Sequence, residues 1–206
     1  MKFEFTSTIR LPAFAWAALI VPHRSTVRVI AGDGVIHRNN VFWEGLSLVP
    51  EAPDAAPGQH FSLSTGGLAQ HDQVTFWTPG HILDRLFLIQ SSGRIFVSNS
   101  LPFVLRVSGV GLAKGYLHYP WQFGHIVAHS QSAPLEKGRV WIISNANLAI
   151  GREGRIHVSA KPAAPKFADY AEYIGLVQAF LDQVAEANRQ SAGGPYCSCC
   201  HAVERI

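Results

Sequence analysis

Short apolar segments separated by turn residues fill the first 160 residues of the chain. The clearest pair lies at residues 83–89 and 94–98, where leucine, isoleucine, valine and phenylalanine gather. Ser91, Ser92 and Gly93 lie between the two, and a glycine that accepts positive φ suits a hairpin turn. The same reasoning predicts turns at 31–34 and 66–67 and short strands at 3–6, 14–21, 27–30, 35–36, 41–43, 61–63, 74–77, 139–144, 147–150 and 155–158.

Two places in the pattern predict helices. Asn99 or Ser100 can cap a short helix, because the residues that follow include a proline suited to a first helical turn. After Asp169 the apolar residues recur with a period near 3.6, and Asp169 followed by Glu172 has the form of a capping box. This pattern predicts an amphipathic helix from Asp169 to Arg189.

These elements divide the chain into three predicted parts. Residues 1–160 form a β-rich domain, residues 161–192 a proline-bearing linker with the amphipathic helix, and residues 193–206 an irregular tail. Residues 109–132 show no clear period and are expected to be irregular, with room for a short helix. The predicted fold class is α+β, with antiparallel β-sheet layers, flanking helices and a long C-terminal helix.

Composition narrows the function classes. Of the 206 residues, 48% are hydrophobic and 15% are charged, which favours a globular core over disorder. The net charge is only +3 and the basic residues are scattered singly, so nucleic-acid binding is not expected.

The most continuous apolar run, residues 11–21, is too short for a membrane span, which needs about 20 residues. A signal peptide is the alternative to a buried strand here, with Lys2 and Arg10 preceding the apolar run. Glu4 and the lack of an A-x-A cleavage site before Pro22 favour the strand. A cytoplasmic protein without a membrane partner is therefore expected.

The cysteines and histidines are candidate metal ligands. Cys197, Cys199, Cys200 and His201 are crowded in the tail without the paired C-x2-C spacing of structural zinc sites, so a tail without function is favoured over a metal site. All three cysteines lie there, which leaves no thiol nucleophile in the remainder of the chain.

Other sequence signals for chemistry are weak. His118, His125 and His129 are interpreted as surface or hydrogen-bonded core residues in preference to metal or acid–base groups. Asp84 and Arg85 are interpreted as a structural pair at a strand end rather than a site ion pair. G-x-S-x-G and G-x-G-x-x-G do not occur in the chain. The residues thus predict no catalytic, cofactor-binding or metal-binding side chain and no cofactor.

One stretch nevertheless resembles a known family. DRLFLIQSSGRIFVSNSLPFVL, from Asp84 to Leu105, is similar to the asparagine synthetase segment in which an Asp-Arg pair precedes a turn, a strand ending in F-A-S-E and a short helix. Asp84, Arg85, Ser98 and Asn99 hold the corresponding places as structural motif residues, whereas the family's glycine and Pro-Leu-Tyr-Tyr are absent. The similarity follows residues 81–192 and is greatest to bacterial asparagine synthetase-related proteins.

The resemblance implies a degenerate glutamine-amidotransferase-like domain of the Ntn-hydrolase type, from a family of ATP-dependent amide-forming ligases. Lys2 stands where the family has its cysteine nucleophile, and no S-G-G-x-D-S loop follows the helix. We therefore expect a non-catalytic domain truncated before the ATP-pyrophosphatase domain, with a shifted reading frame after about Tyr196 as a further hypothesis. The helix Asp169–Arg189 would be the stub of the synthetase domain and would bind such a domain or a second copy of the chain.

Two other functions stay open on the sequence alone. One is an autonomous hydrolase with a serine or threonine nucleophile, which would require that hydroxyl to cluster with a histidine and a carboxylate. The other is a small zinc-binding interaction module built on the cysteine-rich tail.

Overall fold

The computed structural model describes residues 1–44, 64–80, 84–124, 129–161 and 166–191. The chain divides into two compact units, Met1–Pro162 (unit 1) and Ala163–Ile206 (unit 2). Unit 1 holds every strand that the structure describes, and unit 2 holds one helix.

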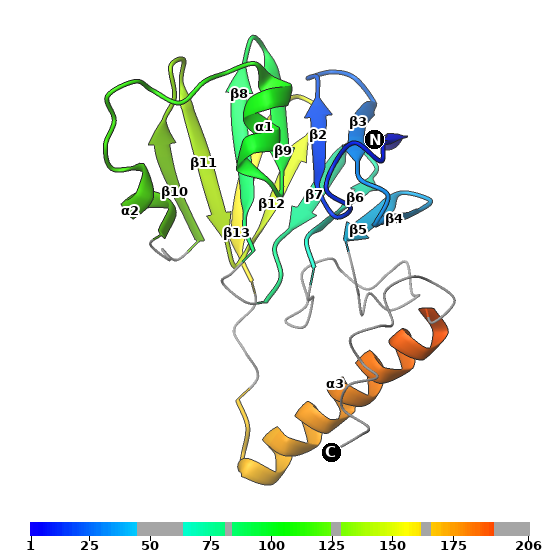
Figure 1. The fold of residues 1–206 in the computed structure, drawn as a ribbon. Coiled ribbons are helices and arrows are strands. Elements are labelled where there is room, and N and C mark those ends of the chain that lie inside the picture. Colours follow the sequence, from blue (N-terminus) through cyan, green and yellow to red (C-terminus); the bar gives the residue numbers. More distant parts are fainter. Residues whose placement is uncertain (45–63, 81–83, 125–128, 162–165, 192–206) are drawn as a thin grey trace. The chain divides into compact units, whose positions relative to one another are not determined.

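The first layer of unit 1 is a seven-stranded sheet in the order β1-β3-β2-β9-β8-β11-β10 (Figure 1). Its neighbours are antiparallel except for β1 and β3, which run parallel. The hairpin predicted around Gly93 is confirmed, with positive φ at Ser92 and Gly93. The strands are β1 (Lys2–Ser7), β2 (Trp16–Ile20), β3 (Thr26–Ala31), β8 (Leu86–Ser91), β9 (Arg94–Ser98), β10 (His129–Pro134) and β11 (Arg139–Ser144).

The second layer is a six-stranded antiparallel sheet in the order β13-β12-β7-β6-β5-β4. The prediction of mixed α+β structure with mostly antiparallel sheets is therefore confirmed. The strands are β4 (Val35–Arg38), β5 (Val41–Glu44), β6 (Gly66–Gln70), β7 (Gln73–Trp77), β12 (Ala146–Gly151) and β13 (Ile156–Ala160).

Two local predictions are wrong. Gly66 and Gly67 are predicted to form a turn but belong to β6. Glycine is needed at position 66 because a Cβ there would lie 2.3 Å from the Trp77 ring and from the Phe42 carbonyl oxygen. The region expected to be irregular contains β10, whose polar sequence HSQSAP lacks the apolar alternation of a recognisable strand. The strand predicted at residues 61–63 lies outside the described residues.

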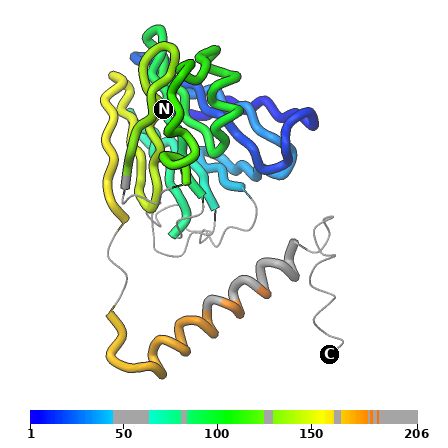
Figure 2. The backbone as a smooth tube through the Cα atoms, turned by 60° about the vertical axis from the view of Figure 1, so that its left-hand side comes forward, coloured from blue at the N-terminus to red at the C-terminus, as the bar shows by residue number. Residues whose placement is uncertain are grey.

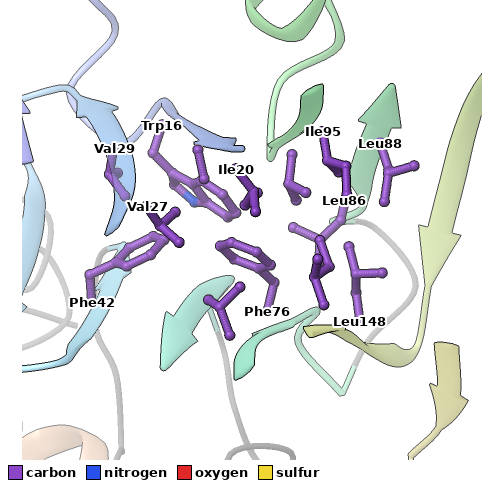
Figure 3. Close-up of a cluster of buried hydrophobic side chains, with 14 of the residues drawn as sticks. Trp16, Ile20, Val27, Val29, Phe42, Phe76, Leu86, Leu88, Ile95 and Leu148 are labelled. Carbon is purple, nitrogen blue, oxygen red and sulfur yellow. The ribbon is translucent and has the colours of Figure 1, made fainter. Parts of the chain in front are cut away.

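The main hydrophobic core lies between the two sheets (Figure 3). Trp16, Phe42 and Phe76 are fully buried at its centre. The Trp16 ring stacks on Phe76 at 5.6 Å between centroids and meets the edge of Phe42 at 4.9 Å. These contacts join β2 of one sheet to β5 and β7 of the other.

A second hydrophobic cluster covers the outer face of the seven-stranded sheet. It contains side chains of α1 (Leu101–Ser108) and α2 (Tyr119–Gly124) together with Ile89 and Phe96 of the sheet. Ser100 is the N-cap of α1 without a side-chain cap bond, and Gly109 ends the helix with a φ of 67°. Figure 2 shows unit 1 from a second side, with β13 (yellow) at one edge.

Unit 2 contains α3 (Tyr170–Ser191). One half of the predicted capping box is present, because Asp169 Oδ1 accepts from the Glu172 backbone N–H at 2.9 Å. Glu172 Oε2 accepts from the backbone N–H of Ala168, the residue before Asp169, at 2.6 Å. Residues 193–206, including the cysteine-rich tail, lie outside the described residues. Among the residues that the structure describes, no helix combines the length and apolar character needed to cross a membrane.

Candidate functional site

Polar side chains from both sheets meet at one end of the sandwich, where β2 and β6 begin and β5 and β9 end. We call this set of residues, Trp16, Glu44, Thr65, Ser98 and Asn99, the Glu44 network. Burying a polar group costs free energy unless a hydrogen bond compensates it. The network meets that condition with bonds that cross from one sheet to the other.

Glu44 is the centre of the network. It is the last residue of β5, and its Oε1 accepts hydrogen bonds from the Thr65 backbone N–H at 3.1 Å and from Thr65 Oγ1 at 2.6 Å. Its Oε2 accepts a hydrogen bond from Asn99 Nδ2. Thr65 directly precedes β6 and Asn99 directly follows β9, so one carboxylate joins the two sheets.

Asn99 fixes the start of β2. Its Oδ1 accepts from the Trp16 backbone N–H at 3.0 Å, and its Nδ2 donates to the Phe14 carbonyl oxygen at 2.8 Å as well as to Glu44. The strand register explains the position of Asn99. Ser98, the last residue of β9, pairs with Ala17, so Asn99 lies next to Trp16. The Trp16 indole completes the link by donating from Nε1 to Thr65 Oγ1 at 2.9 Å.

The environment of Glu44 shifts the pKa of its carboxyl group. Burial raises the pKa of the Glu44 carboxyl above its ordinary value, and the negative charge of Asp84 raises it further. Hydrogen bonds from Thr65 and Asn99 oppose this rise without cancelling it. Together, these effects favour the protonated form more strongly in Glu44 than in an exposed glutamate.

The structure separates the four residues of the asparagine synthetase-like motif. Ser98 and Asn99 belong to the Glu44 network, and Asp84 acts on Glu44 through its charge. Arg85 instead donates from Nη1 to the Phe123 carbonyl oxygen in α2. Three of the four motif residues therefore interact with groups at one end of the sandwich. The fourth, Arg85, contacts α2.

The hydroxyl groups of Thr65 and Ser98 already make hydrogen bonds within the protein. Ser98 Oγ donates to the Trp16 carbonyl oxygen at 2.5 Å and accepts from the Ser100 N–H at 3.0 Å. Thr65 Oγ1 accepts from Trp16 and donates to Glu44. Within the described residues, no histidine is hydrogen-bonded to either hydroxyl, and both residues are fully buried. The arrangement suits structural joining better than nucleophilic attack.

Residue 2 lies far from the network. Lys2 begins the edge strand β1 in register with Thr26, whereas Ser7 at the other end of β1 is in register with Ala31. Ala31 in turn pairs with Trp16. The start of β1 is therefore at the opposite end of the seven-stranded sheet from the Glu44 network.

Of the remaining sequence candidates, the structure describes His118 and His129. His118 packs against Tyr116 before α2, and His129 opens β10. His125 and the cluster from Cys197 to His201 lie outside the described residues. In the part of the chain that the structure describes, no three metal-binding side chains come together.

Trp16, Glu44 and Thr65 are the network residues that sequence reasoning misses. The available signal is a carboxylate directly after the apolar segment 41–43, which has no charged neighbour in sequence to pair with. No family model matches the chain, and no curated protein matches it either. The Glu44 network is thus the main structural observation on which a function can rest.

Proposed function

We propose that unit 1 is a non-catalytic glutaminase-like domain of an asparagine synthetase-related protein. The observation that carries this proposal is the Glu44 network, in which a carboxylate, a hydroxyl and an amide bind one another at the end of the sandwich. Two stacked, mostly antiparallel sheets with helices on one outer face agree with the Ntn-hydrolase-like fold that the sequence resemblance implies.

The chemistry of unit 1 supports a non-catalytic role. Attack on a glutamine amide needs a strong nucleophile, which a thiolate provides at neutral pH. All three cysteines of the chain lie at positions 197, 199 and 200, outside unit 1. Thr65 and Ser98 are buried, and their hydroxyls already make hydrogen bonds. The network therefore serves to hold the two sheets together.

We further propose that the Asp169–Arg189 segment binds a synthetase domain or a second copy of the chain. Tyr170, Tyr173 and Leu181 of α3 are exposed apolar or aromatic side chains at helical spacing. Such a stripe on a helix is typical of a surface that another protein covers.

The experiment is a glutaminase assay on the full chain. We expect no ammonia release from glutamine above the buffer rate, with a competent glutaminase as the positive control. Ammonia release by the wild-type protein that disappears in the Thr65→Val variant would overturn the proposal. Thr75→Val is the matched control, since Thr75 lies on β7 outside the network.

One observation favours the alternative of an autonomous hydrolase. Thr65 Oγ1 lies 2.6 Å from Glu44 Oε1, and a carboxylate at that distance can accept a hydroxyl proton. Hydrolysis of an activated ester such as p-nitrophenyl acetate distinguishes the two functions. We expect the wild-type rate to equal that of Thr65→Val; a rate that falls with Thr65 but not with Thr75 would establish the hydrolase.

A further inference from the structure

β1 (dark blue in Figure 1) is an end strand of the seven-stranded sheet. It pairs with β3 on one side, and no strand that the structure describes pairs with its other side. Its exposed residues alternate with the partly buried Phe3 and Phe5, which pack on the core between the sheets. An end strand of this kind presents a row of unpaired backbone N–H and C=O groups to which a further strand can bind.

The outward-pointing backbone groups of β1 include those of Phe3 and Phe5. The Lys2 N–H donates to the Ser25 carbonyl oxygen at 2.8 Å, and the Thr8 N–H donates to an oxygen of β3 at 3.0 Å. Even-numbered residues of β1 therefore direct their backbone groups toward β3. Because successive residues of a strand point their backbone groups to opposite sides, the odd-numbered residues direct theirs away from β3.

The other end strand of the same sheet is covered. Two side chains of α2 bind carbonyl groups of β10: Gln122 Nε2 donates to Ser132 at 2.6 Å, and the Tyr119 hydroxyl donates to Pro134 at 2.5 Å. Pro134 also lacks a backbone N–H with which to bind another strand. Within the described residues, the sheet can therefore be extended at β1 more readily than at β10.

We propose that β1 pairs antiparallel with β1 of a second copy of the chain, across a two-fold axis centred on Phe3. The Phe3 residues of the two copies then exchange a pair of N–H···O bonds, since their backbone groups point outward. The Phe5 N–H of each copy donates to the Met1 carbonyl oxygen of the other. A contact across a two-fold axis is closed, so it produces a dimer and not a fibre.

Side-chain charge selects the register of this pairing. Centring on Phe3 places Lys2 directly opposite Glu4 of the second copy, and the two-fold axis repeats the pair. Centring on Glu4 would place two carboxylates opposite each other, and centring on Phe5 would leave Lys2 opposite Thr8. A lysine on an end strand ordinarily opposes pairing with another strand. Here the glutamate two residues later compensates the charge of that lysine.

The test is sedimentation velocity of the full chain over a range of protein concentrations at low ionic strength. We expect a monomer–dimer equilibrium that is weak, because the paired segments are short. Glu4→Lys places lysine opposite lysine in both halves of the contact, so it should weaken dimerisation about tenfold. Glu153→Lys, at an exposed glutamate between β12 and β13, is the matched control and should leave dimerisation unchanged.

A double variant tests the register. Lys2→Glu combined with Glu4→Lys restores opposite charges across the axis, so it should dimerise as strongly as wild type. A double variant as weak as Glu4→Lys alone would overturn the proposal. A chain that stays monomeric at every concentration would overturn it as well. A dimer that Glu4→Lys leaves unchanged would place the contact elsewhere, such as on α3, and would also overturn it.

Discussion

Glu44, which is partly buried, and Lys161, which is buried, are charged residues at the same end of the six-stranded sheet. Because β5 and β13 run in the same direction, both residues lie where those strands end. Glu44 accepts three hydrogen bonds, whereas Lys161 Nζ makes none with the described residues. The difference lies in the face that each residue occupies.

The inner and outer faces of the sheet offer different partners. Glu44 shares the inner face with Phe42, so the second sheet stands opposite and supplies Asn99. On the outer face, Lys161 Nζ has no hydrogen-bond partner among the described residues, and neither has Asn147 Oδ1 on the neighbouring strand. Donors from both sheets bind the Glu44 carboxylate, whereas the burial of an unpaired ammonium group such as that of Lys161 destabilises the fold.

The largest expected effect comes from removing the partner that crosses the sheets. Asn99→Ala deletes the donor to Glu44 and the acceptor of the Trp16 N–H, which leaves buried polar groups unpaired. We expect a loss of about 3 kcal/mol in the free energy of unfolding. Urea unfolding followed by tryptophan fluorescence measures it.

The control for this prediction is Asn40→Ala, at an exposed asparagine. It should change the unfolding free energy by about 0.5 kcal/mol or less. A similar small effect for Asn99→Ala would show that the Glu44 network does not join the sheets, and the contrast with Lys161 would disappear.

Sequence patterns predict the strands of this fold better than they predict its site. The hairpin at Ser92 and Gly93 is local, since alternating residues and a turn glycine lie within one segment. The Glu44 network joins residues 55 positions apart in sequence at Glu44 and Asn99, and 83 apart at Trp16 and Asn99. Only the pairing of distant strands brings them together, so no spacing rule reveals the network.

The glycines of β6 also depend on residues that are distant in sequence. Gly66 and Gly67 read as a turn because glycine is rare inside strands. Their role depends on Phe42 and on the Trp77 ring, which occupy the space that side chains would need. Resemblance to a family identifies Asn99 as a motif residue, yet its bonds to Trp16 and Glu44 emerge only in three dimensions.

The next largest effect concerns the unpaired charge. Lys161→Met removes a buried ammonium and keeps most of the side-chain volume, so the variant should be more stable than wild type by about 2 kcal/mol at pH 7. The folded-state pKa of Lys161 is about 8, below its ordinary value of 10.5. Wild type should therefore gain stability relative to the variant as pH rises from 8 to 10.5, and their difference should narrow.

Urea unfolding of both proteins between pH 7 and pH 10.5 measures this convergence. Lys137→Met, at an exposed lysine, should track wild type across the range. A gap between wild type and Lys161→Met that stays constant with pH would mean that Lys161 is not desolvated.

The smallest effect is the pH dependence of Glu44, because its hydrogen bonds offset part of the cost of burial. The folded-state pKa lies above the ordinary value of 4.5, so the protonated form is favoured in the folded protein. Its stabilisation is fully present below pH 4.5 and is lost as pH rises through the folded-state pKa. Wild type should therefore weaken relative to Glu44→Gln over this interval.

The glutamine variant introduces its own constant cost, since its NH2 group must face the donors of either Thr65 or Asn99. Only the pH-dependent part of the difference in unfolding free energy therefore reports on Glu44. Glu4→Gln, at an exposed glutamate of β1, should show no comparable drift. If wild type instead gains on Glu44→Gln as pH rises, the three hydrogen bonds outweigh burial and Asp84 together. Glu44 would then be a strongly stabilised carboxylate, which would widen its contrast with Lys161.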